Sequence, residues 1–250
     1  MAPVRILLSA DTVGGVFTYA CDLVRGLRER DVEVVVATFG DALSPAQRTA
    51  LAGAGPAAVH ESTLRLEWME QPWGDVAAAR AWLLELAARE RVDLVHLNGY
   101  AHAAADWPVP VLVGAHSCVL SWWRGVHDAD APAAWQRYKR EVRAGLRRAD
   151  AVVAPSVSML ADVDRFYGPL GAVMQVIPNG SSAPAAPAQT PKEPFVLGAG
   201  RLWDDAKNLG LLDRAAAALP FEVRVAGPLG DRTPRHARAL GPLDAEALRA

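Results

Sequence analysis

Residues 195–212 read FVLGAGRLWDDAKNLGLL, and they show most clearly the succession of strand, glycine turn and helix on which the predicted fold rests. An apolar run predicts a strand, two glycines predict a turn, and the apolar residues from Leu209 onward predict a helix. Two cations, Arg201 and Lys207, lie six residues apart in this turn. Glycines let a backbone approach a ligand, and basic side chains near a helix N-terminus neutralise an anion. The stretch therefore predicts either a phosphate site or an ordinary turn with two solvated basic side chains.

The same order of strand, glycine turn and helix occurs at the front of the chain. The apolar run Val4–Ser9 is followed by Gly14–Gly15 and by an amphipathic helix predicted at Val16–Arg30. Further short apolar strands alternate with helices and are predicted at 32–38, 57–60, 92–97, 109–114, 151–154 and 173–177. Near-continuous apolar strands separated by helices indicate a parallel sheet covered on both faces. The predicted fold class is α/β, with a doubly wound parallel sheet.

A change in composition divides the chain into two predicted domains. Residues 181–194, SSAPAAPAQTPKEP, lack periodicity and are rich in Pro, Ala and Ser, which predicts an interdomain linker. The N-terminal Rossmann-like domain is predicted at residues 1–180. A second domain is predicted at residues 195–250, where strand, helix and strand indicate the beginning of a right-handed βαβ unit. Roughly 55 residues are few for an independent α/β domain, so this second domain is predicted to be incomplete.

The composition is that of a globular protein without a dominant charge. Of the 250 residues 51% are hydrophobic and 22% are charged, which allows a substantial core. The net charge of −2 gives no global basic field, so no nucleic-acid partner is predicted. Basic residues gather locally between Arg137 and Arg148. On a helix they predict a solvated face, with contact to an anionic membrane surface as the alternative.

Cysteine usage and the N-terminus predict a cytoplasmic location. The two cysteines, Cys21 and Cys118, lie far apart and form no disulfide framework, which fits a reducing compartment. The first apolar stretch is too short for a signal peptide, and no apolar run approaches the roughly 20 residues that span a bilayer. Peripheral contact with the inner face of the membrane is the alternative that accompanies the basic helix.

The pair Gly14–Gly15 stands at the carboxyl end of the first predicted strand. Open α/β sheets bind ligands at such positions, so the pair predicts close approach of a ligand to the backbone. The alternative is a tight turn that needs positive φ angles. The pair lacks the G-x-G-x-x-G spacing, which disfavours a dinucleotide site and therefore a dehydrogenase.

Two histidines end predicted strands. His116 follows an apolar strand and is placed to contact a substrate, because carboxyl ends of parallel strands line the functional crevice. Covalent catalysis by the neighbouring Ser117 or Cys118 is disfavoured, since adjacent residues of an extended chain point to opposite sides and no G-x-S-x-G elbow is present. His96 ends another strand and is either a substrate contact or a hydrogen-bonded structural histidine.

Aromatic and polar residues supply further candidates. Trp122 and Trp123 cannot both point inward from one element, so Trp123 and the adjacent Arg124 are candidates for the wall of the cleft. Asn179 lies in the turn that closes the first domain and is a candidate for ligand contact as well as for turn geometry. No D-x-D pair follows an apolar strand, so no metal ion is predicted.

Together these residues resemble glycosyltransferase family 4, whose members are retaining, nucleotide-sugar-dependent enzymes with two facing Rossmann-like domains (the GT-B architecture). The resemblance runs through essentially the whole chain. It is carried by Gly14-Gly15-Val16, His116-Ser117, Ala154-Pro155-Ser156, Val176-Ile177-Pro178-Asn179-Gly180, and Gly200-Arg201 followed by Lys207-Asn208.

The resemblance implies that residues 1–180 form the acceptor-side domain and residues 195–250 the start of the donor-binding domain, and it implies a role for each matching position. Arg201 and Lys207 would bind the diphosphate of the nucleotide sugar and stabilise the leaving group without a metal ion. Gly14 and Gly15 would lie beside the donor phosphates and the acceptor. His116 would contact the donor sugar near its anomeric carbon.

The remaining candidates divide between the donor and the acceptor. Asn179 is assigned to the donor side, and His96, Trp123 and Arg124 to the acceptor side. The implied partners are a nucleotide sugar and an acceptor of unknown kind, with no cofactor.

One departure from the family pattern concerns the end of the sequence. Family members place an acidic E-x₇-E motif late in the second domain, and this sequence ends before any such motif. The expectation is a C-terminally truncated member of the family. Two alternatives remain open, namely a non-catalytic binding or partner remnant of such an enzyme, and a GT-B epimerase that acts on a nucleotide sugar.

Overall fold

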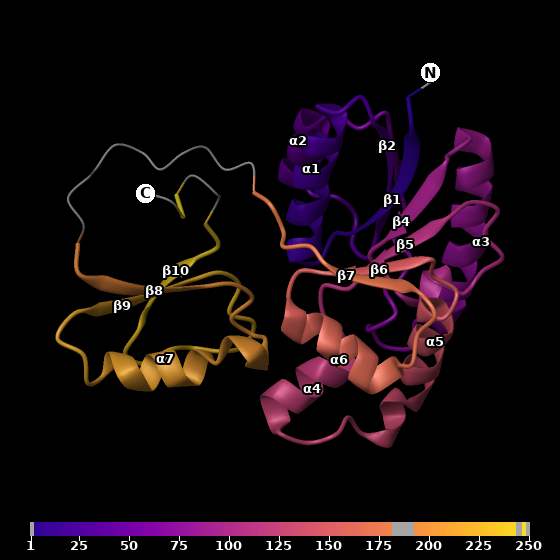
Figure 1. The fold of residues 1–250 in the computed structure, drawn as a ribbon. Coiled ribbons are helices and arrows are strands. Elements are labelled where there is room, and N and C mark those ends of the chain that lie inside the picture. The colour runs from indigo at the N-terminus through magenta and orange to yellow at the C-terminus, as the bar shows by residue number, and fades with distance from the viewer. Residues whose placement is uncertain (1–2, 182–192, 244–246, 249–250) are drawn as a thin grey trace. The chain divides into compact units, whose positions relative to one another are not determined.

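The computed structural model describes residues 3–181, 193–243 and 247–248 (Figure 1). The chain divides into two compact units, one formed by 1–124 with 129–183 and the other by 125–128 with 184–250. Most of the predicted linker, residues 182–192, lies outside the described residues. No helix within these described ranges is long and apolar enough to cross a membrane.

The first unit is built on a seven-stranded sheet in which every pair of neighbours is parallel. Its strands are β1 (Arg5–Asp11), β2 (Glu33–Phe39), β3 (Ala58–Glu61), β4 (Leu94–Leu97), β5 (Val111–Gly114), β6 (Ala151–Ala154) and β7 (Val173–Val176). They lie in the order β3-β2-β1-β4-β5-β6-β7. The predicted parallel sheet is confirmed. The direction of winding changes between β1 and β4, which is where open α/β sheets form their ligand crevice.

Helices cover both faces of this sheet, as a doubly wound fold requires (Figure 1). The helices are α1 (Gly15–Arg28), α2 (Pro45–Ala54), α3 (Trp73–Glu90), α4 (Val119–His127), α5 (Gln136–Leu146) and α6 (Val157–Tyr167), with 3₁₀ turns η1 (Ala101–Ala103) and η2 (Ala133–Trp135). Apolar side chains of α1 and α2 pack with Leu8 and Val34 on one face. Those of α3, α5 and α6 pack with Val95 and Val113 on the other.

The helix ends explain why the sequence carries a start signal for α2 and none for α4. Ser44 begins α2 with a reciprocal capping box to Gln47, and Gly55 ends it at φ +78°. No helix was predicted where α4 forms. Its first turn is fixed by Cys118, whose Sγ accepts a hydrogen bond from the Ser121 backbone N–H at 3.3 Å. Because cysteine is not among the usual N-cap residues, the sequence carried no start signal there.

The second unit contains a parallel sheet of three strands in the order β10-β9-β8 (Figure 1). The strands are β8 (Phe195–Ala199), β9 (Glu222–Ala226) and β10 (Arg238–Gly241), with the turn η3 (Asp205–Lys207) and helix α7 (Leu209–Ala216) after β8. Leu202, Leu209 and Val225 are buried together in its core. The strand β10 was not predicted, because its sequence RALG lacks an apolar pattern and its register with β9 is irregular.

Candidate functional site

Three polar side chains of the first unit meet over Gly114, the last residue of β5. A Cβ atom at Gly114 would lie 2.6 Å from Asn98 Oδ1, 3.1 Å from His116 Nε2 and 3.2 Å from His96 Nε2. Only a residue without a side chain leaves room for this cluster. It stands at the carboxyl ends of β4 and β5, so the structure brings His96 and His116 together beside the predicted crevice.

Asn98 connects His116 to the first strand by hydrogen bonds. Its Oδ1 lies 3.0 Å from His116 Nε2. Its Nδ2 donates to the Ser9 carbonyl oxygen at 2.6 Å, and its backbone N–H donates to Ser9 Oγ at 2.8 Å. Ser9 and Asn98 are 89 residues apart in sequence, and the pairing of β1 with β4 is what makes them neighbours.

Tyr19 of α1 forms the side wall of this cluster. Its ring meets the His116 ring edge-on with centroids 4.4 Å apart and lies 6.2 Å from the His96 ring. Sequence reasoning missed Tyr19, Asn98 and Ser9. The available signals were the polar Asn98 directly after an apolar strand, and Tyr19 one turn into the helix that follows Gly15.

Both histidines of the cluster are held neutral at physiological pH. Burial lowers the pKa of His116 to about 4. Burial and the nearby His116 lower the pKa of His96 to about 4. His96 is buried, and its Nε2 has no hydrogen-bond partner. His96 is therefore not a structural histidine with both nitrogens bonded, and both rings are neutral groups that can donate one hydrogen bond and accept another.

The glycine pair at the start of α1 adopts no left-handed backbone. Gly14 is the N-cap and is extended at φ −160°. Gly15 begins the helix, and a Cβ there would have nothing within 4 Å. The tight-turn interpretation with positive φ angles is therefore wrong for this pair, and the open space at Gly15 leaves room beside the first turn of the helix.

The other predicted candidates of the first unit lie apart from this cluster in sequence and on other elements. Trp122 and Trp123 are consecutive residues of α4, both half-buried, with ring centroids 5.9 Å apart. Arg124 forms an ion pair with Asp130 at 3.6 Å. Asn179 is exposed in the loop after β7. None of these contacts bears on an acceptor or a donor role, so both assignments stay predictions.

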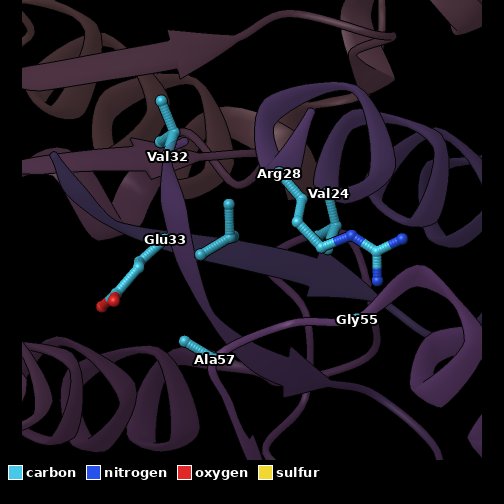
Figure 2. A pocket seen from close by; sticks show the side chains of 7 residues that line it. Val24, Arg28, Val32, Glu33, Gly55 and Ala57 are labelled. Carbon is cyan, nitrogen blue, oxygen red and sulfur yellow. The ribbon is translucent and has the colours of Figure 1, made fainter. Parts of the chain in front are cut away.

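A pocket of about 230 Å³ lies at the opposite edge of the same sheet (Figure 2). It is lined by Val24, Arg28, Val32, Glu33, Val34, Gly55 and Ala57. These residues come from the end of α1, the start of β2 and the segment before β3, so the pocket opens at the amino ends of the strands. Ligands of open α/β sheets bind at the carboxyl ends, and none of the predicted site residues lines this pocket.

In the second unit, the loop after β8 holds the predicted cationic pair. Asp204 is buried and organises the loop: Oδ2 accepts a hydrogen bond from Arg201 at 3.2 Å, and Oδ1 accepts one from the Ala206 backbone N–H at 2.9 Å. The Arg201 guanidinium also lies 5.3 Å from the Trp203 ring centre. Asp204 was not predicted to have a role, and its carboxylate is one of the groups that hold Arg201.

Gly200 brings Lys207 beside Arg201. It adopts φ +146°, and a Cβ there would lie 3.0 Å from Lys207 Cε, so the lysine stem packs across the glycine. The exposed Lys207 ammonium forms no ion pair with any described carboxylate. The neighbouring Asp205 is instead paired with Arg232. One held guanidinium and one uncompensated ammonium therefore stand together at the carboxyl end of β8.

A buried carboxylate supports the segment that follows Asn98. Glu67 accepts hydrogen bonds from the backbone N–H groups of Tyr100 (3.1 Å) and Ala101 (2.6 Å), at the start of η1. Burial raises its pKa to about 7, against the opposing effect of these two hydrogen bonds. The group is therefore part protonated near neutral pH.

We expect Glu67 to make stability depend on pH. Because the pKa in the folded state lies above the ordinary value of 4.5, its contribution is largest below pH 4.5 and is lost as the pH rises through 7. The free energy of unfolding, measured with urea between pH 4.5 and 8, should fall by up to about 3 kcal/mol from this group. Glu67→Gln should remove that dependence and Glu85→Gln, at an exposed position of α3, should keep it. Parallel pH profiles for wild type and Glu67→Gln would contradict the assignment.

Within the parts of the chain that the structure describes, no three His, Cys, Asp or Glu side chains form a group that could hold a metal ion.

Comparison with known proteins identifies the family. The sequence profile of Glycosyltransferase Family 4 matches residues 13–182. No curated protein sequence matches the chain. The glycosyltransferase from Rickettsia africae is similar in structure, with 12% identity and a TM-score of 0.62 over 100% of this chain and 70% of that one.

Two further solved structures share the fold. The UDP-glucosyltransferase from Polygonum tinctorium has 12% identity and a TM-score of 0.62, over 98% of this chain and 72% of that one. The UDP-N-acetylglucosamine 2-epimerase from Rickettsia bellii has 9% identity and a TM-score of 0.56, over 98% and 71%. At these identities the likeness shows the fold alone, which is the expected GT-B fold. Because the profile covers more than half of the sequence, the chain belongs to glycosyltransferase family 4.

Proposed function

We propose that this protein transfers a sugar from a nucleoside-diphosphate sugar to an acceptor hydroxyl, with retention at the anomeric carbon and without a metal ion. The observation that carries the proposal is the cationic pair at the end of β8, where Asp204 holds Arg201 and where Lys207 has no described carboxylate partner. Two cations can neutralise the departing diphosphate, which is the charge that develops in glycosyl transfer.

The cluster around Gly114 supplies neutral hydrogen-bonding groups for the sugar in this proposal. His116 is proposed to contact the donor sugar near its anomeric carbon. A neutral imidazole can donate and accept hydrogen bonds without adding a charge near the reacting centre. Gly14 and Gly15 are proposed to lie beside the donor, since Gly15 presents open space at the start of α1.

The residues that contact the acceptor and the cellular location are also proposed. His96, Trp123 and Arg124 are proposed to contact the acceptor, and Asn179 the donor. The unpartnered Nε2 of His96 supports its inclusion. The protein is proposed to act in the cytoplasm, and a basic helix α5 allows peripheral contact with an anionic membrane surface.

The proposal is tested by calorimetric titration with UDP, GDP, ADP and dTDP, followed by incubation with the corresponding nucleotide sugars in the presence of a chelator. We expect one nucleoside diphosphate to bind more tightly than its nucleoside. The sugar of the corresponding nucleotide sugar should be transferred or slowly hydrolysed, and an α-linked donor should give an α-configured product. Inversion at the anomeric carbon, or activity lost with the chelator, would contradict the stated mechanism. An isomerised nucleotide sugar would indicate an epimerase, and no binding of any diphosphate would indicate a non-catalytic protein.

His116→Ala is expected to reduce turnover about tenfold or more while the affinity for the nucleoside diphosphate stays within twofold of wild type. The lost interaction, on the order of 1.5 kcal/mol, is one made to the sugar and not to the nucleotide. Steady-state rates and calorimetry measure the two effects separately. His127→Ala, at an exposed position of α4, is the matched control and should change neither. Unchanged turnover in His116→Ala would remove this residue from the site.

A further inference from the structure

The hydrogen bonds of Asn98 determine which way its side-chain amide faces. Nδ2 lies 2.6 Å from the Ser9 carbonyl oxygen. A carbonyl oxygen can only accept, so the donor NH₂ group must face it. Oδ1 must therefore face His116 Nε2, from which it is 3.0 Å distant. The flipped amide would bring two acceptors together at Ser9.

This amide orientation determines the position of the proton on His116. Oδ1 of asparagine can only accept a hydrogen bond, so Nε2 of His116 must donate one. A neutral imidazole carries a single N–H proton, so Nδ1 then carries a lone pair. Nδ1 forms no hydrogen bond with any residue that the structure describes. The free position on the ring is therefore an acceptor and not a donor.

The surroundings hold the ring and the amide in this arrangement. The backbone N–H of Asn98 is bound to Ser9 Oγ at 2.8 Å, which anchors the residue to β1. Tyr19 packs edge-on against the His116 ring at 4.4 Å between centroids. The missing side chain of Gly114 leaves room for both Oδ1 and Nε2. These contacts involve β1, α1, β5 and the residue that follows β4, so the geometry does not depend on a single loop.

We propose that Asn98 is a positioning residue that keeps His116 in the Nε2–H tautomer, so that Nδ1 accepts a hydrogen bond from a hydroxyl group of the sugar. This inference rests on the proposed function for the identity of the hydroxyl, while the tautomer itself does not. The contact also predicts a specificity. A sugar in which that hydroxyl is replaced by hydrogen or by a methyl ether offers no donor to Nδ1, so its binding is disfavoured.

The tautomer is tested by long-range ¹H–¹⁵N correlation spectra of the full chain labelled with ¹⁵N-histidine, with the His116 signals assigned by their loss in His116→Gln. At neutral pH the wild type is expected to show a protonated-type Nε2 and an unprotonated-type Nδ1. The opposite pattern, or an average of the two tautomers, overturns the inference, and this measurement needs neither a variant of Asn98 nor any activity.

Variants of Asn98 test whether this residue is the cause. Asn98→Leu removes the acceptor and should shift His116 toward a mixture of tautomers, with turnover lowered as in His116→Ala. Asn98→Asp keeps an acceptor and should retain the Nε2–H tautomer. Gln175→Leu, which removes an amide on β7 without a described side-chain hydrogen bond, is the matched control and should leave the His116 spectrum unchanged. An unchanged tautomer in a folded Asn98→Leu variant overturns the role of Asn98.

The hydroxyl contact is tested by adding UDP-glucose, GDP-mannose and ADP-glucose, each against its nucleoside diphosphate at a concentration that saturates binding. A sugar nucleotide that binds is expected to shift the Nδ1 resonance toward the hydrogen-bonded value, while the sugar-free diphosphate leaves it in place. Equal shifts for both ligands overturn the contact. An Nε2–H tautomer in a protein that binds none of these compounds would refute the proposed function and the hydroxyl contact, and would leave the tautomer assignment standing.

Discussion

Gly227→Ala is expected to destabilise the second unit by about 3 kcal/mol or more, because the position combines a close backbone approach with a left-handed conformation. Gly227 follows β9 at φ +131°. A Cβ atom there would overlap the Gly200 carbonyl oxygen and lie 2.9 Å from the Gly200 carbonyl carbon. Both neighbours are backbone atoms, so no side-chain rotation can relieve the overlap.

The same substitution is expected to disturb the cationic pair. The Gly200 N–H is bound to the Ala226 carbonyl at 3.0 Å, and the Gly227 N–H to the Gly241 carbonyl at 2.8 Å. Separating Gly200 from Gly227 therefore strains the ends of all three strands of this sheet. Lys207 packs across Gly200, so its ammonium moves with the displaced backbone.

Hydrogen exchange measured by mass spectrometry checks this prediction. Peptides covering β8 and β9 should exchange faster in Gly227→Ala than in wild type, while peptides of β1 and β4 should not change. Gly210→Ala in α7 is the matched control, since a Cβ there would meet only the flexible Arg214 Nη1 at 3.5 Å. Alanine favours a helix over glycine by about 1 kcal/mol, so the control should be neutral or stabilising. Equal protection of β8 and β9 in Gly227→Ala and wild type would show that the backbone yields without cost.

The sheet of the first unit could be predicted because its information is local. Each of the seven strands contains a short apolar run that could be recognised, most clearly in the buried β1 and β2, and the segment Ala151–Ala154 was located to the residue. Strand β10 and helix α4 were missed because neither carries a local signal. The first has a short sequence, RALG, without an apolar pattern and is held by β9, and the second begins at a cysteine.

The candidate site could be predicted only in part, because its contacts are not local. His116 and His96 were found as residues that end strands. Their shared neighbour Asn98 acquires its role from Ser9, 89 residues earlier, and Tyr19 from the packing of α1 against the sheet. A sequence pattern places residues on elements, but it does not show which side chains of different elements touch. The role of Asp204 was missed for a related reason. A carboxylate in a predicted turn is expected to be solvated, whereas Asp204 is buried in the structure.

Removing both cations of the loop after β8 is expected to weaken the binding of a nucleoside diphosphate by about 100-fold or more. Each of Arg201 and Lys207 is proposed to form a charge-assisted hydrogen bond to the diphosphate, worth on the order of 1.5–3 kcal/mol. Lys207→Ala removes an ammonium with no described carboxylate partner, so its loss leaves no buried charge uncompensated. Arg201→Ala also leaves Asp204 with one hydrogen-bond donor fewer, so the negative charge of this carboxylate is less compensated.

The comparison between ligands decides where these two side chains act. The double variant Arg201→Ala with Lys207→Ala should lose affinity for the diphosphate and retain the affinity for the matching nucleoside, as measured by calorimetry. The wild-type affinity for the diphosphate should also fall with added salt, since exposed charges are screened. Arg214→Ala, which removes a cation from α7 of the same unit, is the matched control and should change neither affinity. Equal losses for the diphosphate and the nucleoside would mean that Arg201 and Lys207 stabilise the loop instead of contacting the phosphates, and the proposed site would then have no anion-binding residues in this unit.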